Sequence, residues 1–135
     1  KTRDGIELAV AICYEDAYGA EQLYALPRAA ILINVSNDAW FGDSIAPHQH
    51  LQIARMRSLE VGRPAIRATN TGISAFIAAD GRVLESGPQF RPVTMSMEVQ
   101  PRQGSTPYAG AGNWIILSIC FLIAGGFWLR GQARL

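Results

Sequence analysis

The sequence predicts an α/β domain followed by one membrane-spanning helix, and three observations support this fold class. Residues 6–12 alternate large apolar side chains with small or polar ones, as a half-buried strand does. A helix-compatible stretch at 17–26 separates this strand from a continuous apolar run at 30–35, as expected of a second, buried strand. Residues 103–129 contain no charged side chain, and such a stretch is long enough to cross a bilayer.

The first predicted strand, Ile6–Ile12, ends in a polar turn that begins with a cysteine. The large apolar side chains at its even-numbered positions predict one fully buried face, and the other face is expected to be partly buried. Cys13 comes next, and Asp16 is the expected N-cap of a helix at Ala17–Leu26. Such a turn points the thiol outward, near the positive end of the helix dipole, which favours the thiolate. Cys13 is therefore the candidate nucleophile, although a free cysteine alone is more often a buried small hydrophobe.

The remaining elements of the domain, over residues 1–100, are predicted from apolar patterns and turn residues. An Asp-Gly pair at 80–81 is typical of a hairpin. The predicted elements are a strand covered on both faces at Ala30–Val35, a helix at His48–Val61, strands at Pro64–Thr69, Ile73–Ala79 and Arg82–Glu85, and a last strand at Pro92–Val99.

Two polar segments interrupt this pattern. The loop Ser36–Gly42 consists of turn-forming residues and carries Trp40 and Phe41, and a second turn lies at Asn70–Gly72. From the residues alone, the aromatic pair is as consistent with packing back onto the core as with a ligand contact. The second segment is equally consistent with a plain turn.

Charge and ligand patterns argue against nucleic acid and metal as partners. Twelve Lys and Arg against eleven Asp and Glu give a net charge of +1, whereas a nucleic-acid surface needs a clustered basic face. His48 and His50 would point to different faces of a helix, and no cysteine or carboxylate cluster completes a metal site. Both histidines are expected to be structural or solvated. Cys13 and Cys120 lie in a polar turn and an apolar run, so no disulfide is expected between them.

A linker at 101–107 leads to the predicted transmembrane helix at 108–130. Arg130 and Arg134 follow the apolar span, so the positive-inside tendency predicts a cytoplasmic tail at 131–135. The domain that contains the cysteine would then lie on the other side, which is the periplasm in a Gram-negative cell. A buried core helix is the alternative, but such helices seldom exceed about 10–14 unbroken apolar residues.

Three segments carry a resemblance to a known family: ICYE at 12–15, NVSNDAWFG at 34–42 and RMRSLEVGRPAIRATNTG at 55–72. They resemble the carboxy-terminal part of the bacterial apolipoprotein N-acyltransferases, which are membrane members of the nitrilase, or carbon-nitrogen hydrolase, superfamily. The resemblance covers essentially the whole chain. It implies the second half of a nitrilase-like α-β-β-α sandwich, followed by the transmembrane helix. A start at Lys1 without Met or a signal-like segment is likewise expected of a fragment.

The resemblance also implies an activity at the bacterial inner membrane that needs no cofactor. The cysteine would take an acyl chain from a phospholipid as a thioester and pass it to the amino-terminal amine of a lipoprotein. Cys13 would be the nucleophile, the backbone N–H of Tyr14 would help to hold the oxyanion, and Glu15 would order the turn or position a partner group. The residues that would contact substrate lie in the two polar segments: Asn37, Trp40, Phe41 and Thr71.

A nitrilase-type site also needs a lysine and a general-base glutamate, which the resemblance places upstream. Lys1 is the only lysine in the chain, so these 135 residues alone are expected to be inactive. Two alternatives to acyl transfer stay open. One is a membrane-tethered amidase or nitrilase that uses water as the acceptor, and the other is a nitrilase-fold binding module without activity.

Overall fold

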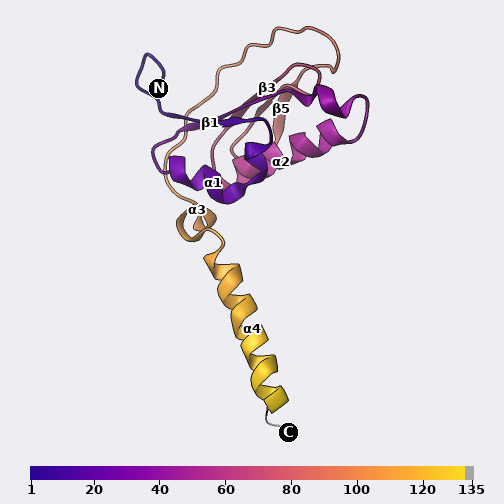
Figure 1. The fold of residues 1–135 in the computed structure, drawn as a ribbon. Coiled ribbons are helices and arrows are strands. Elements are labelled where there is room, and N and C mark those ends of the chain that lie inside the picture. Colours follow the sequence, from indigo (N-terminus) through magenta and orange to yellow (C-terminus); the bar gives the residue numbers. More distant parts are fainter. Residues whose placement is uncertain (133–135) are drawn as a thin grey trace.

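A five-stranded sheet forms the centre of the α/β domain in the computed structural model, which describes residues 1–132 (Figure 1). Its strands, in spatial and chain order, are β1 (Leu8–Ile12), β2 (Ile31–Ser36), β3 (Ala65–Thr69), β4 (Ala75–Ile77) and β5 (Val83–Ser86). The first three strands are parallel, and the last two continue the sheet in antiparallel pairs. These strands confirm five of the six that the sequence predicted, including the hairpin at 80–81.

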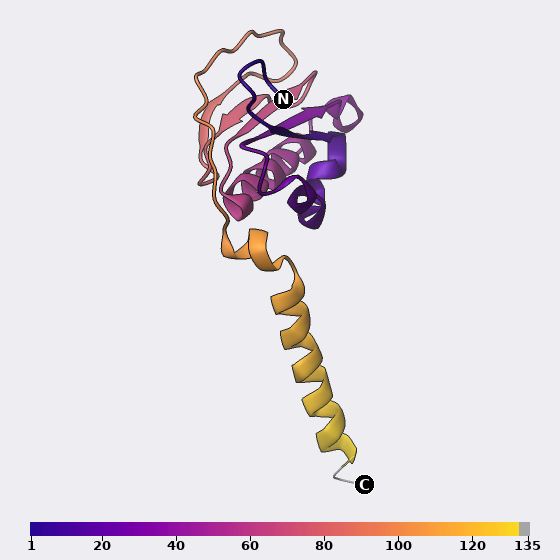
Figure 2. The same ribbon diagram turned by 90° about the vertical axis from the view of Figure 1, so that its left-hand side faces the viewer.

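Helices cover one face of this sheet (Figure 2). The longest of them in the domain, α2 (Ala46–Val61), begins two residues before its predicted start. It ends at Gly62, whose φ of +64° is the left-handed conformation that favours glycine after a helix. The side chains that pack between the sheet and α2 are mostly small: Ala9, Leu32, Ala65, Ala75 and Ile77 from the strands, and Ala54 and Val61 from α2.

The opposite face of the sheet is apolar and open, so the prediction for the two faces of β1 is wrong. Val10 and Ile12 are 60% and 61% exposed, whereas Ala9 and Ala11 are buried. The helices approach closely where the strand side chains are small, and this leaves the larger side chains on the other face. The larger apolar side chains on this other face form what we call the open sheet face: Val10, Ile12, Ile33, Val35, Ile66 and Phe76. Because β2 contributes to it, β2 is not covered on both faces as predicted.

The segment after β1 is not the single helix predicted at Ala17–Leu26. It consists of a 3-10 turn, η1 (Cys13–Ala17), a short helix, α1 (Gly19–Gln22), and a second 3-10 turn, η2 (Leu23–Ala25). Asp16 is not an N-cap, because it is buried inside η1 and faces charged partners on other elements. These long-range contacts outweigh the local capping preference.

The last predicted strand, Pro92–Val99, is also wrong. The period of two persists, since Met95 and Met97 are partly buried while Thr94 and Ser96 are exposed. However, none of the described residues pairs with this segment in a ladder, and alternation without a hydrogen-bonded neighbour does not make a strand. The segment arcs over the end of the domain farthest from the C-terminal helix (Figure 1).

The apolar C-terminal segment folds as two helices rather than one. Helix α3 (Pro107–Ala111) ends at Gly112, which has a φ of +55°, and α4 (Trp114–Gln132) follows. Within residues 1–132, α4 is the one helix long and apolar enough to cross a membrane. Its 19 residues span about 28 Å at 1.5 Å per residue, close to the roughly 30 Å of a bilayer core.

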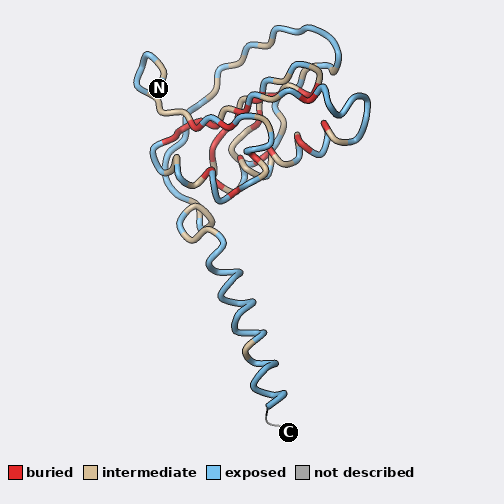
Figure 3. Tube along the Cα trace, in the orientation of Figure 1, coloured by how far each residue is buried: buried red, intermediate tan, exposed pale blue. Residues whose placement is uncertain are grey.

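Helix α4 extends away from the domain and is exposed along its length (Figure 3). Within residues 1–132 no core covers it, which argues against the alternative of a helix buried in the core of this domain. Of the predicted tail at 131–135, residues 133–135 lie outside the part of the chain that the structure describes.

Candidate active site

The three segments singled out from the sequence follow the carboxyl ends of the three parallel strands. Cys13 follows β1, Asn37 follows β2 and Asn70 follows β3. The register aligns the ends of these strands to within one residue. Ligands of open parallel sheets bind at this edge, so the sheet brings the predicted site segments to a common location.

Cys13 is held in an unusual backbone conformation. Its φ is +55°, which costs a non-glycine residue about 1–3 kcal/mol and therefore needs support from its surroundings. Asn34 gives that support by donating its side-chain amide to the carbonyl oxygen of Cys13 at 3.0 Å and to that of Ala11 at 3.4 Å. Glu15 adds to it, because its carboxylate accepts a 2.6 Å hydrogen bond from the backbone N–H of Ile12. The backbone is thus fixed on both sides of the thiol, as in the strained strand-to-helix turns that expose nucleophiles.

Tyr14 lies between the cysteine and α2. Its side chain is half exposed, and the centre of its ring lies 5.4 Å from that of His50. The backbone N–H of Tyr14 belongs to the first turn of η1, where N–H groups have no partner within the helix. It is therefore available to a negatively charged group beside Cys13.

The loop after β2 is tied to the turn after β3. Asn37 caps the 3-10 turn η3 (Asp38–Phe41) by accepting from the backbone N–H of Ala39 at 3.1 Å. The same oxygen accepts from the side chain of Asn70 at 2.7 Å. Asn70 in turn accepts from the backbone N–H of Thr71, also at 2.7 Å. The structure thus connects Asn37 and Thr71, which the sequence places more than thirty residues apart.

The two aromatic residues of this loop remain accessible. Trp40 is 88% exposed and Phe41 is 37% exposed. Trp40 therefore does not pack back onto the core, and its large apolar surface is free to meet another molecule.

A buried polar cluster beneath the site was not predicted from the sequence. Its five members are each at most 4% exposed: Asp16, Asn34, Asp38, His50 and Arg67. A signal was present, because Asn34 and Arg67 interrupt otherwise apolar strands and lie side by side in the register of β2 and β3. His50 is thus structural, as expected, and His48 is exposed. No three His, Cys, Asp or Glu side chains of residues 1–132 are grouped as a metal site would need.

The fold and the cysteine turn correspond to a known class of protein. Residues 1–108 match the carbon-nitrogen hydrolase family, and the chain belongs to that family. A carbon-nitrogen hydrolase from Helicobacter pylori G27 aligns over 61% of this chain and 36% of its own, with a TM-score of 0.52 and 19% identity. An amidase from Nesterenkonia sp. aligns over 87% of this chain and 45% of its own, with a TM-score of 0.53 and 16% identity. At these identities the likeness shows the fold alone.

Within this family, the chain is much more similar to apolipoprotein N-acyltransferases, which confirms the resemblance found in the three segments. It is 51% identical to that of Methylococcus capsulatus over 121 residues, which cover 90% of this chain and 24% of the relative. It is 52% identical to that of Haemophilus influenzae over 116 residues, which cover 84% of this chain and 22% of the relative. The chain therefore spans about a quarter of the length of these curated relatives.

Proposed function

We propose that the chain is the carboxy-terminal part of a membrane-anchored N-acyltransferase that acts in lipoprotein maturation. The observation that supports this most strongly is the identity of about 50% to apolipoprotein N-acyltransferases over 90% of the chain. Residues 1–108, which match the carbon-nitrogen hydrolase family, include the turn in which Cys13 is held at a positive φ. A carboxy-terminal span on the same chain as this turn suits an enzyme that takes its acyl donor from a bilayer.

The reaction takes place in two steps at the sulfur of Cys13. The thiolate attacks an ester carbonyl carbon of a phospholipid, the S–C bond forms and the ester C–O bond breaks. The general base passes the thiol proton to the departing alcohol oxygen. The amino-terminal amine of the lipoprotein then attacks the thioester, the C–N bond forms, the C–S bond breaks and the thiol regains a proton.

In this mechanism the described residues present the thiol and the acyl pocket. The backbone N–H of Tyr14 donates to the oxyanion, and Glu15 keeps the turn in place through the N–H of Ile12. Trp40 and Phe41 hold the acyl chain. Asn37 and Thr71 line the same edge of the sheet as substrate contacts.

The general base and the oxyanion-stabilising lysine come from outside these 135 residues. Lys1 is the only lysine in the chain, and it pairs with Glu7 at 2.9 Å, near the amino end of β1. Cys13 lies at the carboxyl end of the same strand. We therefore expect the isolated chain to be inactive, since one member of a catalytic unit retains little of its rate.

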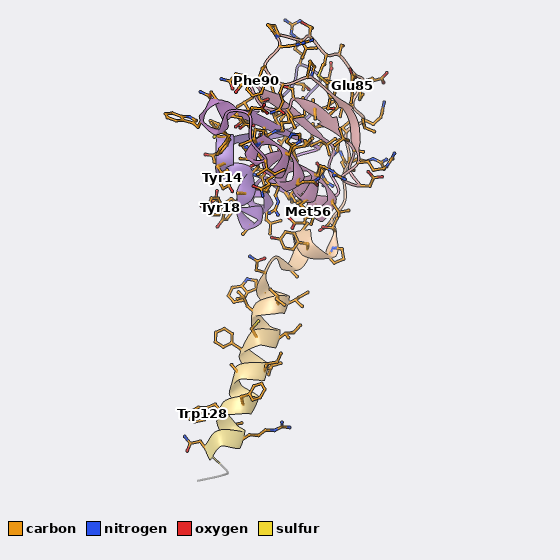
Figure 4. All side chains as sticks on the ribbon, turned by 90° about the vertical axis from the view of Figure 1, so that its right-hand side faces the viewer. Tyr14, Tyr18, Met56, Glu85, Phe90 and Trp128 are labelled. Carbon is orange, nitrogen blue, oxygen red and sulfur yellow. The ribbon has the colours of Figure 1, made fainter. Side chains whose placement is uncertain are left out.

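Helix α4 spans the inner membrane in this proposal. Figure 4 places the exposed residues Tyr18 and Met56 at the end of the domain nearest α4, where the bilayer surface would lie. Trp128 lies near the C-terminal end of the helix, at the opposite membrane boundary. Arg130 follows in the last turn, so the positive-inside tendency puts this end in the cytoplasm and the domain in the periplasm.

Intact-mass spectrometry of the complete protein, incubated with phospholipid in detergent, tests the proposed function. We expect the mass of one acyl chain to be added to the wild type and not to Cys13→Ala. Addition of a peptide with a lipid-modified amino-terminal cysteine should remove the acyl group from Cys13. The acyl group should then appear as an amide on the peptide. An adduct that survives Cys13→Ala, or no adduct on the wild type, contradicts the proposal.

The same experiment separates the two other functions. A tethered amidase leaves the phospholipid ester intact and instead hydrolyses the C–N bond of an amide substrate, with or without the acceptor peptide. A binding module without activity forms no adduct and releases nothing.

A further inference from the structure

Four buried polar side chains form a closed ring beneath the candidate site. His50 contacts Asp16 through Nε2 at 3.0 Å and Asp38 through Nδ1 at 3.1 Å. Arg67 closes the ring from the other side, with Nη2 2.9 Å from Asp38 and Nη1 3.5 Å from Asp16. Each of the four is at most 3% exposed. This set is called the buried ring below.

The contacts of the buried ring give each carboxylate two partners. Asp16 and Asp38 each contact one nitrogen of His50 and one nitrogen of Arg67. A buried polar group needs such partners, because one left without them costs free energy.

The buried ring reaches two of the three segments of the site through its own members. Asp16 belongs to η1, the turn that begins with Cys13. Asp38 is the first residue of η3, the turn that carries Trp40, and it also accepts a 2.6 Å hydrogen bond from Ser36 at the end of β2.

A relay through Asn34 links the buried ring directly to the cysteine. Arg67 donates to the side-chain oxygen of Asn34, and the amide nitrogen of Asn34 donates to the carbonyl oxygen of Cys13 at 3.0 Å. The left-handed backbone of Cys13 is costly and needs such external support. The support therefore depends on how Arg67 orients Asn34.

We propose that the buried ring is a positioning device for catalysis, which sets the Cys13 turn and the Trp40 loop relative to each other. None of its members touches the reacting atoms. The role in acyl transfer rests on the proposed function, whereas the control of the Cys13 conformation does not. Four parts of the fold, η1, η3, α2 and β3, are joined by one set of buried contacts.

A pair of buried arginines provides the test. Arg63 is buried as deeply as Arg67, at 2% exposure each, but it donates to the carbonyl oxygens of Ala29 at 2.8 Å and Gly104 at 2.7 Å, away from the site. Arg67→Lys and Arg63→Lys each keep a positive charge and lose the planar fork. Both should lower the thermal midpoint of the complete protein.

Only Arg67→Lys should change the chemistry of Cys13. In this variant we expect the alkylation of Cys13 by iodoacetamide, measured by peptide mass spectrometry, to slow by about tenfold or more. Thioester formation from phospholipid should slow by up to about a hundredfold, as for a displaced catalytic group. The phospholipid concentration at half-saturation should stay within about twofold of the wild type. Arg63→Lys should leave all three values near those of the wild type. Equal effects of the two variants on Cys13 alkylation would overturn the proposal.

One further variant keeps the test decisive if Arg67→Lys fails to fold. Asn34→Asp retains the acceptor for Arg67 and removes the donor to Cys13, so it too should slow alkylation, and an unchanged rate contradicts the relay.

If the wild type forms no thioester, the proposed function fails while the alkylation and melting results still decide the role of the buried ring.

Discussion

Replacing Trp40 by alanine should separate acyl transfer from the stability of the fold. The indole is 88% exposed, so its removal should change the free energy of unfolding by no more than about 0.5 kcal/mol, as at other surface positions. If an acyl chain covers the indole during reaction, the burial of this apolar surface contributes roughly 1.5–3 kcal/mol. Loss of that contribution from the transition state corresponds to a rate about ten- to a hundredfold lower.

The assay compares two reactions of the same thiol. Thioester formation from phospholipid is followed by intact mass under single-turnover conditions, and alkylation of Cys13 by a small water-soluble reagent is measured in parallel. Trp40→Ala should slow the first reaction and change the second much less, because alkylation does not use the acyl pocket. Tyr24 is a matched control, since it is 87% exposed and lies on η2 rather than in the loop, and Tyr24→Ala should slow neither reaction by more than about twofold.

Two results would refute this reasoning. One is an unchanged rate of acylation in Trp40→Ala, which would leave the exposed indole without a role in lipid contact. The other is an equal reduction of both reactions, which would mean that the substitution disturbs the Cys13 turn and not an acyl pocket.

Two other substitutions test the packing around the site. In Gly72→Ala, the new methyl group would lie 2.8 Å from side-chain carbons of Asp38, so the substitution should cost roughly 1–3 kcal/mol of stability and lower the thermal midpoint. The control Gly110→Ala meets only one atom, at 4.0 Å, and should leave the midpoint unchanged. Equal midpoints for the two variants would contradict this. Val10→Asp places a charge on the open sheet face. If a second layer covers that face, the substitution should destabilise the complete protein by at least about 3 kcal/mol in denaturant unfolding, while the control Tyr24→Asp should be near neutral. A neutral Val10→Asp would mean that the face meets water.

The sequence predicted the elements of the sheet well because their signals are local. Alternation, turn residues and helix stops depend on neighbours within a few positions. The same locality explains why the three site segments were recognised, since each is a run of polar residues directly after an apolar strand. Their meeting at one edge follows from the parallel register, which the pattern of strands and helices already favours.

The errors concern partners that are distant in the sequence. Alternation in β1 shows that two faces differ, but it does not say which one the helices cover, and here they cover the face with Ala9 and Ala11. Asp16 has the composition of an N-cap, yet its partners lie 34 and 51 positions away, at His50 and Arg67. The buried ring was missed for the same reason. Arg67 interrupts an apolar strand, which is a local signal, but only the fold brings it together with Asp16, Asp38 and His50.

Asn34 and the buried ring support Cys13 from the helix-covered side of the sheet. Across the sheet, the row formed by Val10, Ile33, Ile66 and Phe76 presents an apolar surface that residues 1–132 cover only in part. Val93 and Met95 line a cavity with Ile66 and Phe76, whereas Val10 is 60% exposed. A layer that packs on the rest of this surface would reach the same edge of the sheet from the side opposite α2. We therefore expect one element both to cover the apolar row and to bring the base and the lysine to Cys13.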